Sequence, residues 1–245
     1  MLWQVMQDSA AGYDGSQRSL SGLSGGDGEK YTQMLSSGKM MCGTYLNDAI
    51  ATALKVSECN ACMKRIVAAP TAGSCGVIPA VLIPYRKEYP DTPEEEMLHA
   101  LYVTGGFGNI IAERASVSGA EAGCQAEIGA ASAMAAAALV YLRGGSPEAC
   151  GNACAMALKN LLGLVCDPVG GLVEVPCVKR NVIGAMDALS AAQMALAGIE
   201  SRVPPDQVLD AMAEVGRSLP PSLRETGKGG LAATPFGMAY APKEG

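Results

Sequence analysis

The spacing of apolar residues along this chain predicts a succession of helices. Over positions 43–56, apolar residues recur at Leu46, Ile50 and Leu54, which places them on one face of a helix. A similar pattern over about 180–199 carries Met186, Leu189 and other apolar residues. No alternating pattern of the kind typical of strands stands out, so the chain is expected to be all-α.

The segment 119–142 is apolar on nearly every side. A helix without a polar face must lie inside the protein. Its most apolar part, residues 128–142, is about fifteen residues long, whereas a bilayer needs roughly 20. We therefore expect a buried central helix and no membrane span, with Ala/Gly-rich helices packed tightly around it in a single globular domain.

Glycine and proline mark where helices begin and end. Ser146 followed by Pro147 is typical of a helix start, and the next helix is predicted to run over about 148–165. The Gly-rich stretch 104–109 predicts a break in the pattern. We expect residues 1–18 to form a partial N-terminal helix and linker, and residues 19–240 to form the domain.

Composition narrows the class of protein. Hydrophobic residues make up 49% and aromatic residues only 4%, so a large core must be built from small side chains. The net charge of -6 argues against a nucleic-acid partner, because phosphate contacts need clustered Lys and Arg. The chain begins without a secretory pattern and has nine cysteines, an odd number, which favours reduced thiols in the cytoplasm.

Two loops of small residues, 19–28 and 69–76, each precede a helical pattern. Consecutive backbone N–H groups in such a turn form a concave site for a carboxylate or phosphate. A flexible linker is the alternative for the first loop. The candidate substrate-binding residues are Ser21, Gly25, Gly26, Thr71, Ala72 and Gly73.

Three cysteines, Cys124, Cys166 and Cys177, lie beside Gly, Pro and acidic residues in predicted loops. Thiolates in such places can hold a metal, and we interpret these three as ligands of a [4Fe-4S] cluster. A four-iron cluster with three protein ligands leaves one iron open to act as a Lewis acid. Their spacing differs from the tight Cys-x-x-Cys runs of electron-carrying ferredoxins and suits dehydration chemistry better.

Other cysteines have less specific patterns. Cys59 and Cys62 form a single Cys-x-x-Cys, which by itself defines neither a zinc site nor a redox pair. Cys150 and Cys154 lie four apart in an Ala-rich helix and are expected to be small core residues.

Five motifs together give the chain a family resemblance. They are 21–27 (SGLSGGD), 69–81 (APTAGSCGVIPAV), 123–129 (GCQAEIG), 166–177 (CDPVGGLVEVPC) and 229–235 (GGLAATP). In this order they resemble the α chain, or catalytic domain, of the iron-sulfur-dependent bacterial L-serine dehydratases, over about residues 19–237.

The resemblance implies an all-α catalytic domain and an oxygen-sensitive [4Fe-4S] cluster on Cys124, Cys166 and Cys177. It implies conversion of L-serine to pyruvate and ammonia. It also implies a partner, since a separate β chain completes the two-chain members, so a hetero-oligomer is expected.

The sequence departs from the family pattern at both ends. The family's α chain usually has more helices before the first loop, so this chain is either truncated or completed by another one. Some single-chain relatives supply a cysteine at the extreme C-terminus, whereas this chain ends at Gly245 without one.

Several alternatives stay open from the sequence. The general base is unassigned: His99, the only histidine, is a weak candidate, and the β chain is a stronger one. A pyridoxal phosphate enzyme would need a suitable lysine, for which Lys228 is the only faint candidate. A subunit that binds serine or a cluster without activity is the second hypothesis, and a zinc or redox protein using Cys59 and Cys62 is the third.

Overall fold

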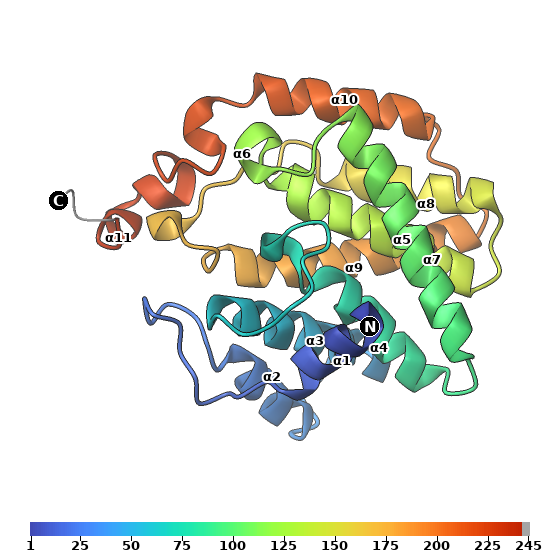
Figure 1. Cartoon of the computed structure of the whole chain (residues 1–245), viewed down its shortest axis with the longest axis horizontal. Coiled ribbons are helices and arrows are strands. Elements are labelled where there is room, and N and C mark those ends of the chain that lie inside the picture. Colours follow the sequence, from blue (N-terminus) through green and yellow to red (C-terminus); the bar gives the residue numbers. More distant parts are fainter. Residues whose placement is uncertain (242–245) are drawn as a thin grey trace.

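The computed structural model describes residues 1–241, and the regular elements in that range are all helical (Figure 1). The prediction of an all-α fold is confirmed. The C-terminal departure noted above falls largely on residues 242–245, outside the described residues. The helices are α1 (Leu2–Ala11), α2 (Asp27–Leu35), α3 (Thr44–Ala61), α4 (Val77–Glu88), α5 (Glu94–Arg114), α6 (Gly119–Ala122), α7 (Ala130–Leu142), α8 (Pro147–Asn160), α9 (Cys177–Leu196), α10 (Pro205–Ser218) and α11 (Pro235–Met238).

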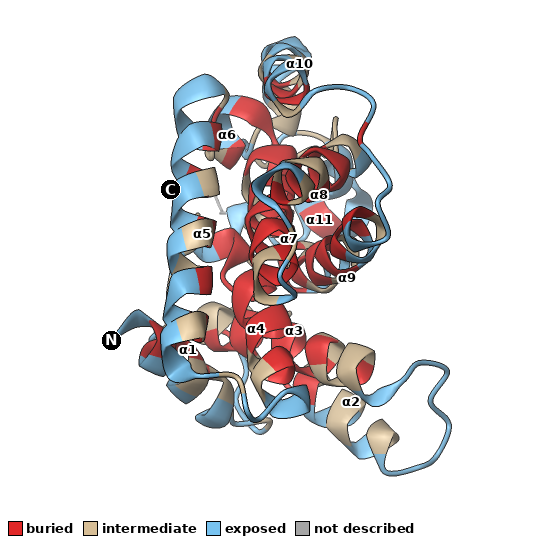
Figure 2. Ribbon diagram, turned by 90° about the vertical axis from the view of Figure 1, so that its right-hand side faces the viewer, coloured by how far each residue is buried: buried red, intermediate tan, exposed pale blue. Residues whose placement is uncertain are grey.

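Helix α7 is the centre of the fold. Every residue from Ala130 to Val140 is buried, and helices α4, α5, α8 and α9 pack around it (Figure 2). The window Gln125–Leu142 is long and apolar enough to cross a membrane, yet 83% of it is buried inside the protein. The central helix is therefore part of the protein core, as the apolar pattern predicted.

Small residues let the helices approach closely. A Cβ atom on Gly184 of α9 would lie 2.9 Å from the side chain of Ile128, just before α7. A Cβ on Gly108 of α5 would lie equally close, 2.9 Å, to the end of the Met134 side chain. These glycines allow α5 and α9 to pack against the central helix, which explains why a core with few aromatic rings is still dense.

Several expectations about helix boundaries were wrong. Helix α5 continues through the Gly-rich stretch 104–109, where we predicted a break. Met97, Ala100, Thr104, Gly108 and Ile111 keep one face of α5 buried throughout, and this packing outweighs the low helix propensity of glycine.

The segment 119–142 is also not one helix. It turns at Gly123, whose φ of 76° lies in the left-handed region, and passes through a π-helical turn at Gln125–Gly129 before α7 begins. π-Helical turns are frequent at functional sites. The predicted helix 148–165 ends earlier, at Asn160, and the one predicted from about 180 begins at Cys177.

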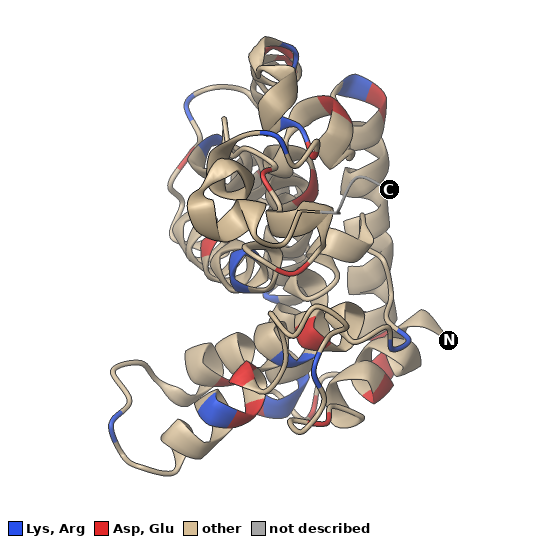
Figure 3. Ribbon diagram, turned by 90° about the vertical axis from the view of Figure 1, so that its left-hand side faces the viewer, with Lys and Arg blue, Asp and Glu red and all other residues tan. Residues whose placement is uncertain are grey.

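Four helices, α3, α4, α7 and α9, pack against one another as a bundle, with extensive contacts in every pair but α3 with α7. Contacts between them place the segments before α4, α7 and α9, and the C-terminal part of α3, at one end of this bundle. On the side of the molecule drawn in Figure 3, Lys and Arg positions are interspersed with Asp and Glu.

Candidate functional site

The three predicted cluster ligands come together at that end of the bundle. Cys124 precedes the π-helical turn, Cys166 pairs through its backbone with the segment around Arg224, and Cys177 is the first residue of α9. All three are buried. Burial raises the pKa of Cys124 and of Cys177 to about 12, and it also raises the pKa of Cys166. For Cys166 and Cys177 the second cause of the raised pKa is the neighbouring Cys124.

Within residues 1–241 no group of three His, Cys, Asp or Glu side chains is spaced to hold a single metal ion. A cluster is several atoms across, so its ligands stand farther apart than those of one ion. The donor set fits such a group: three thiols share a buried site, and the positive charge of Arg180 lowers the pKa of Cys124 against the dominant effect of burial.

Glu127 joins the cysteine site to the second small-residue loop. Thr71 Oγ1 donates a hydrogen bond to Glu127 Oε1 at 2.7 Å, and Cys166 Sγ lies 3.9 Å from Oε2. Burial raises the pKa of the Glu127 carboxyl, against the lowering effect of the Thr71 hydrogen bond. A Cβ on Gly119 would lie 2.6 Å from this carboxylate, and one on Gly73 would lie 3.0 Å away, so a larger residue at either position would displace the carboxylate.

The second loop is held in place by Asn181, which is 1% exposed. The amide N–H of Gly76 donates to Asn181 Oδ1 at 2.8 Å, and Asn181 Nδ2 donates to the carbonyls of Gly73 at 2.7 Å and Cys177 at 3.0 Å. One side chain therefore fixes the loop relative to a predicted cluster ligand.

Ala72 and Gly73 begin a short 3-10 turn, Ala72–Ser74, capped by reciprocal bonds between Thr71 and Ser74. Within the described residues the backbone N–H groups of Ala72 and Gly73 have no acceptor, because they are the first two donors of the turn. These two N–H groups lie beside Glu127, and their binding of a substrate carboxylate stays a prediction.

The first loop reaches the same region through Glu174. Ser19 and Ser21 donate hydrogen bonds to Glu174 Oε2 at 2.5 and 2.8 Å. Glu174 is buried and lies three residues before Cys177. Lys179 of α9 forms a second link to this loop, an ion pair of 2.5 Å with Asp27.

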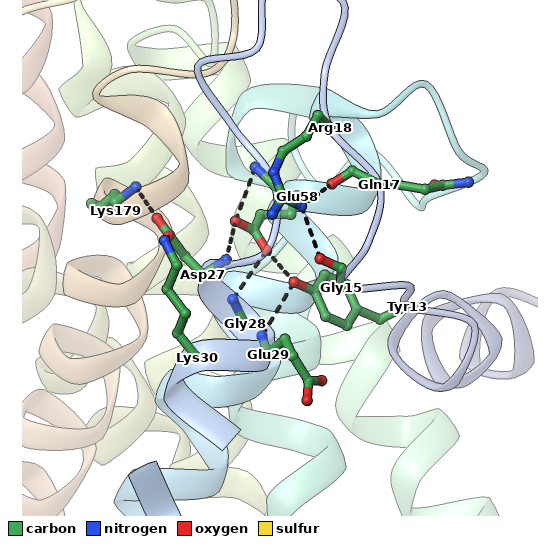
Figure 4. Close-up of polar contacts among 11 residues, drawn as sticks. Tyr13, Gly15, Gln17, Arg18, Asp27, Gly28, Glu29, Lys30, Glu58 and Lys179 are labelled. Atoms are coloured by element: carbon green, nitrogen blue, oxygen red, sulfur yellow. Dashed lines mark hydrogen bonds and ion pairs between the residues drawn. The ribbon is translucent and has the colours of Figure 1, made fainter. Parts of the chain in front are cut away.

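The predicted anion site of the first loop holds a carboxylate of the chain itself. The N–H groups of Gly25 and Asp27 donate to Glu58 Oε1 at 3.2 and 2.9 Å, and that of Gly28 donates to Oε2 at 3.0 Å. The hydroxyl of Tyr13 donates to Glu58 Oε2 at 2.5 Å (Figure 4). We call these donors and Glu58 the Glu58 nest. The amide of Gly25 is thus hydrogen-bonded within the chain, and Gly26 packs against the Arg18 guanidinium.

The C-terminal Gly-rich segment completes the surroundings of Cys166. Asp167 accepts from Arg180 at 2.9 Å and from the N–H of Leu231 at 2.8 Å. The N–H of Cys166 donates to the carbonyl of Leu223 at 2.9 Å, and the carbonyl of Cys166 accepts from the N–H of Glu225 at 2.8 Å. The last of the five motifs therefore holds the loop that carries a predicted ligand.

The remaining candidates lie elsewhere. His99 is half-exposed on α5, beside Glu95, Glu96 and Tyr141. Tyr141 is near the C-terminal end of α7, about 25 Å from Cys124 at 1.5 Å per residue, so this chain does not bring His99 to the cysteines. Cys150 and Cys154 are buried core residues, as predicted.

Sequence reasoning did not assign roles to Glu58, Glu174 and Asn181. Glu58 stands beside polar residues such as Ser57 and Asn60 in the sequence, so its burial becomes evident only in the folded chain. The roles of Glu174 and Asn181 depend on contacts with residues 153 and 108 positions away in the chain. No local pattern marks such partners.

The chain is similar to known proteins over most of its length. The model of the family described as "Serine dehydratase alpha chain" matches residues 1–232. The chain is 54% identical over 225 residues to the probable L-serine dehydratase, alpha chain, of Bacillus subtilis (strain 168), covering 92% of this chain and 75% of that protein.

Two further relatives match a somewhat smaller part of the chain. Identity is 48% over 202 residues with the L-serine dehydratase, alpha chain, of Peptoniphilus asaccharolyticus, covering 82% of this chain and 69% of the relative. Identity is 47% over 181 residues with an L-serine dehydratase of Escherichia coli (strain K12), covering 74% of this chain but 40% of that longer protein.

Proposed function

This chain belongs to the serine dehydratase alpha chain family, and we propose that it is the catalytic α chain of an L-serine dehydratase, which converts L-serine to pyruvate and ammonia. The observation that carries this proposal is the meeting of Cys124, Cys166 and Cys177 with Glu127 and the Thr71 loop in one buried site. The names of the relatives support the substrate and the reaction.

In this proposal Cys124, Cys166 and Cys177 hold a [4Fe-4S] cluster. When bound, such a cluster with three protein ligands supplies an iron with an open position, which can polarise the hydroxyl of serine. The two short links described above, from Asn181 to the carbonyl of Cys177 and from Arg180 to Asp167, fix the ligand-bearing backbone.

The substrate carboxylate would bind at the 3-10 turn. Within the described residues the N–H groups of Ala72 and Gly73 have no acceptor and can bind an anion, whereas the amides of the first loop already bind Glu58. This favours Thr71, Ala72 and Gly73 over Gly25 and Gly26 for direct contact with serine. Ser21 would not contact serine directly, and its role would be to hold Glu174 in position.

Glu127 would orient the substrate next to the cysteines. Its Oε1 is fixed by Thr71, and its Oε2 faces Cys166, so the carboxyl can accept a hydrogen bond from the ammonium or hydroxyl group of serine. Among residues 1–241 the geometry assigns none to removal of the α-proton, and we assign that step to the β chain. Release of water then leaves an enamine, which becomes an imine and hydrolyses to pyruvate and ammonia.

The test is anaerobic co-expression of the chain with its β chain, followed by iron and sulfide counts and measurement of pyruvate formed from L-serine. We expect about four iron and four sulfide per α chain and pyruvate only when both chains are present. Glu127→Gln should retain the iron and sulfide but lose pyruvate formation. An intact cluster and partner without turnover would favour the alternative of a non-catalytic, cluster-binding subunit.

A further inference from the structure

A groove lies at the end of the helix bundle opposite the cysteines. It consists of two adjoining cavities of about 350 and 620 Å³, which share Tyr45, Leu189 and Gln193 as lining residues. Each volume is within the range of small-molecule sites, which is about 300–1,000 Å³. None of the proposed serine- or cluster-binding residues lines either cavity.

The smaller cavity has an aromatic wall. The rings of Tyr85 and Tyr89 lie 4.7 Å apart between centroids, and Tyr45 lines the same cavity. The hydroxyl of Tyr45 donates to the carbonyl of Val81, and that of Tyr85 donates to the carbonyl of Leu142, both at 3.0 Å. Because these bonds fix two of the rings, the wall is already formed before any ligand binds.

One cation belongs to this wall. The Arg143 guanidinium lies over the ring of Tyr89, 4.5 Å from its centroid. Within residues 1–241 no carboxylate lies within ion-pair distance of Arg143. Its guanidinium also interacts with the Tyr85 side chain, and because it has no acidic partner its remaining planar donors are available for a carboxylate.

The larger cavity differs in character. Leu46, Met186 and Leu189 give it apolar walls, and Glu88 is its one charged lining residue. An anionic group is attracted toward Arg143 and repelled from Glu88. The groove therefore fits a ligand whose single negative charge is at one end and whose body is flat and apolar.

We propose that this groove binds a small monocarboxylate with a flat, apolar body, with its carboxylate on Arg143 and its body between the tyrosines and the apolar wall. This ligand is separate from serine. Arg143 follows directly after α7, whose other end leads back to Cys124, about 28 Å away at 1.5 Å per residue. Binding here does not depend on whether the proposed cluster is present.

The test compares two probes of the same shape, indole-3-acetate and its uncharged amide, indole-3-acetamide. Isothermal titration calorimetry on the whole chain, kept anaerobic, gives both dissociation constants. We expect the acetate to bind at least tenfold more tightly than the amide. Absence of saturable acetate binding at millimolar concentration, or equal affinity for the two probes, overturns the proposal without any variant.

Two substitutions locate the site. Arg143→Gln should bring the affinity for the acetate down to that for the amide and leave amide binding unchanged. Arg202→Gln is the matched control, because Arg202 is exposed and lines neither cavity, and it should leave the affinities of both probes unchanged. Tenfold selectivity that persists in Arg143→Gln would place the probe elsewhere and sink the proposal.

Discussion

Ser21 donates a hydrogen bond of 2.8 Å to Glu174, although 153 positions separate them in the sequence. Since Glu174 comes three residues before Cys177, this bond connects the first motif to the loop of a proposed cluster ligand. The first small-residue loop thus acts on the site through the chain's own carboxylates, a role that differs from direct substrate binding.

Removing either partner of this bond should destabilise the protein, and the two effects should not add. We expect Ser21→Ala to lower the free energy of unfolding by about 1–2 kcal/mol, because the bond is made to a charged group in a buried place. Urea unfolding of both single variants and of the double variant with Glu174→Ala should give a coupling energy of about 0.5–2 kcal/mol. Additive losses would show that the two side chains act independently.

Asn181→Ala should be more damaging than an ordinary asparagine substitution. It leaves the N–H of Gly76 and the carbonyls of Gly73 and Cys177 without this partner in a buried place. We expect a loss of about 2–4 kcal/mol in the free energy of unfolding. Asn109→Ala, on the exposed face of α5, is the control and should change it by less than about 0.5 kcal/mol. Equal losses in the two variants would contradict the role given to Asn181.

The Glu58 nest predicts rescue by an added anion. Glu58→Ala removes the acceptor of three backbone N–H groups and of the Tyr13 hydroxyl, and should cost about 3–5 kcal/mol. Formate or acetate can occupy the vacated nest, so either should raise the melting temperature of the variant more than that of the unmodified chain. Sodium chloride at the same ionic strength is the control. A variant that gains nothing beyond the unmodified chain would show that the nest needs the tethered side chain.

The sequence was sufficient to predict the helical class and the buried central helix, and its motifs marked segments that lie together in the folded chain. Those features follow from local periodicity and from motifs, which the chain displays directly. The occupant of the first loop was not predictable, because Glu58 approaches it from α3 only after the chain has folded. The continuity of α5 through Gly105 and Gly106 was missed for a similar reason, since packing on residues outside the stretch decides it.

Burial of Asp187, which lies away from the cysteine site, should make the free energy of unfolding depend on pH. Its carboxyl lies between α7, α8 and α9, where it accepts from Ser132 at 2.7 Å and from Asn160 at 2.6 Å. Burial raises its pKa above the ordinary value of 3.8, against the lowering effect of these two bonds. The folded state therefore disfavours the ionised form, and this penalty is absent below the unfolded pKa and complete above the folded one.

Asp187→Asn removes that penalty and can keep both hydrogen bonds, because the exposed amide of Asn160 is free to rotate. The stability of the variant relative to the unmodified chain should increase as pH rises from about 4 toward 7. Free energies of unfolding measured across this range check the sign. A difference that stays constant or declines with pH would contradict the raised pKa of Asp187.

The last prediction concerns iron retention, which should distinguish the proposed cluster-binding cysteines from the cysteines of the core. Cys124→Ser, Cys166→Ser and Cys177→Ser should each abolish retention of iron and sulfide, because each removes one of only three thiolates. Cys150→Ala and Cys154→Ala remove thiols that are just as buried but lie in the core of α8, so they should keep the full iron count. Anaerobic iron and sulfide assays on the five variants, with circular dichroism to confirm helical folding, make the comparison. A folded Cys150→Ala chain without iron would overturn this division, since it would mean that the ligand set extends beyond the three cysteines gathered near Glu127.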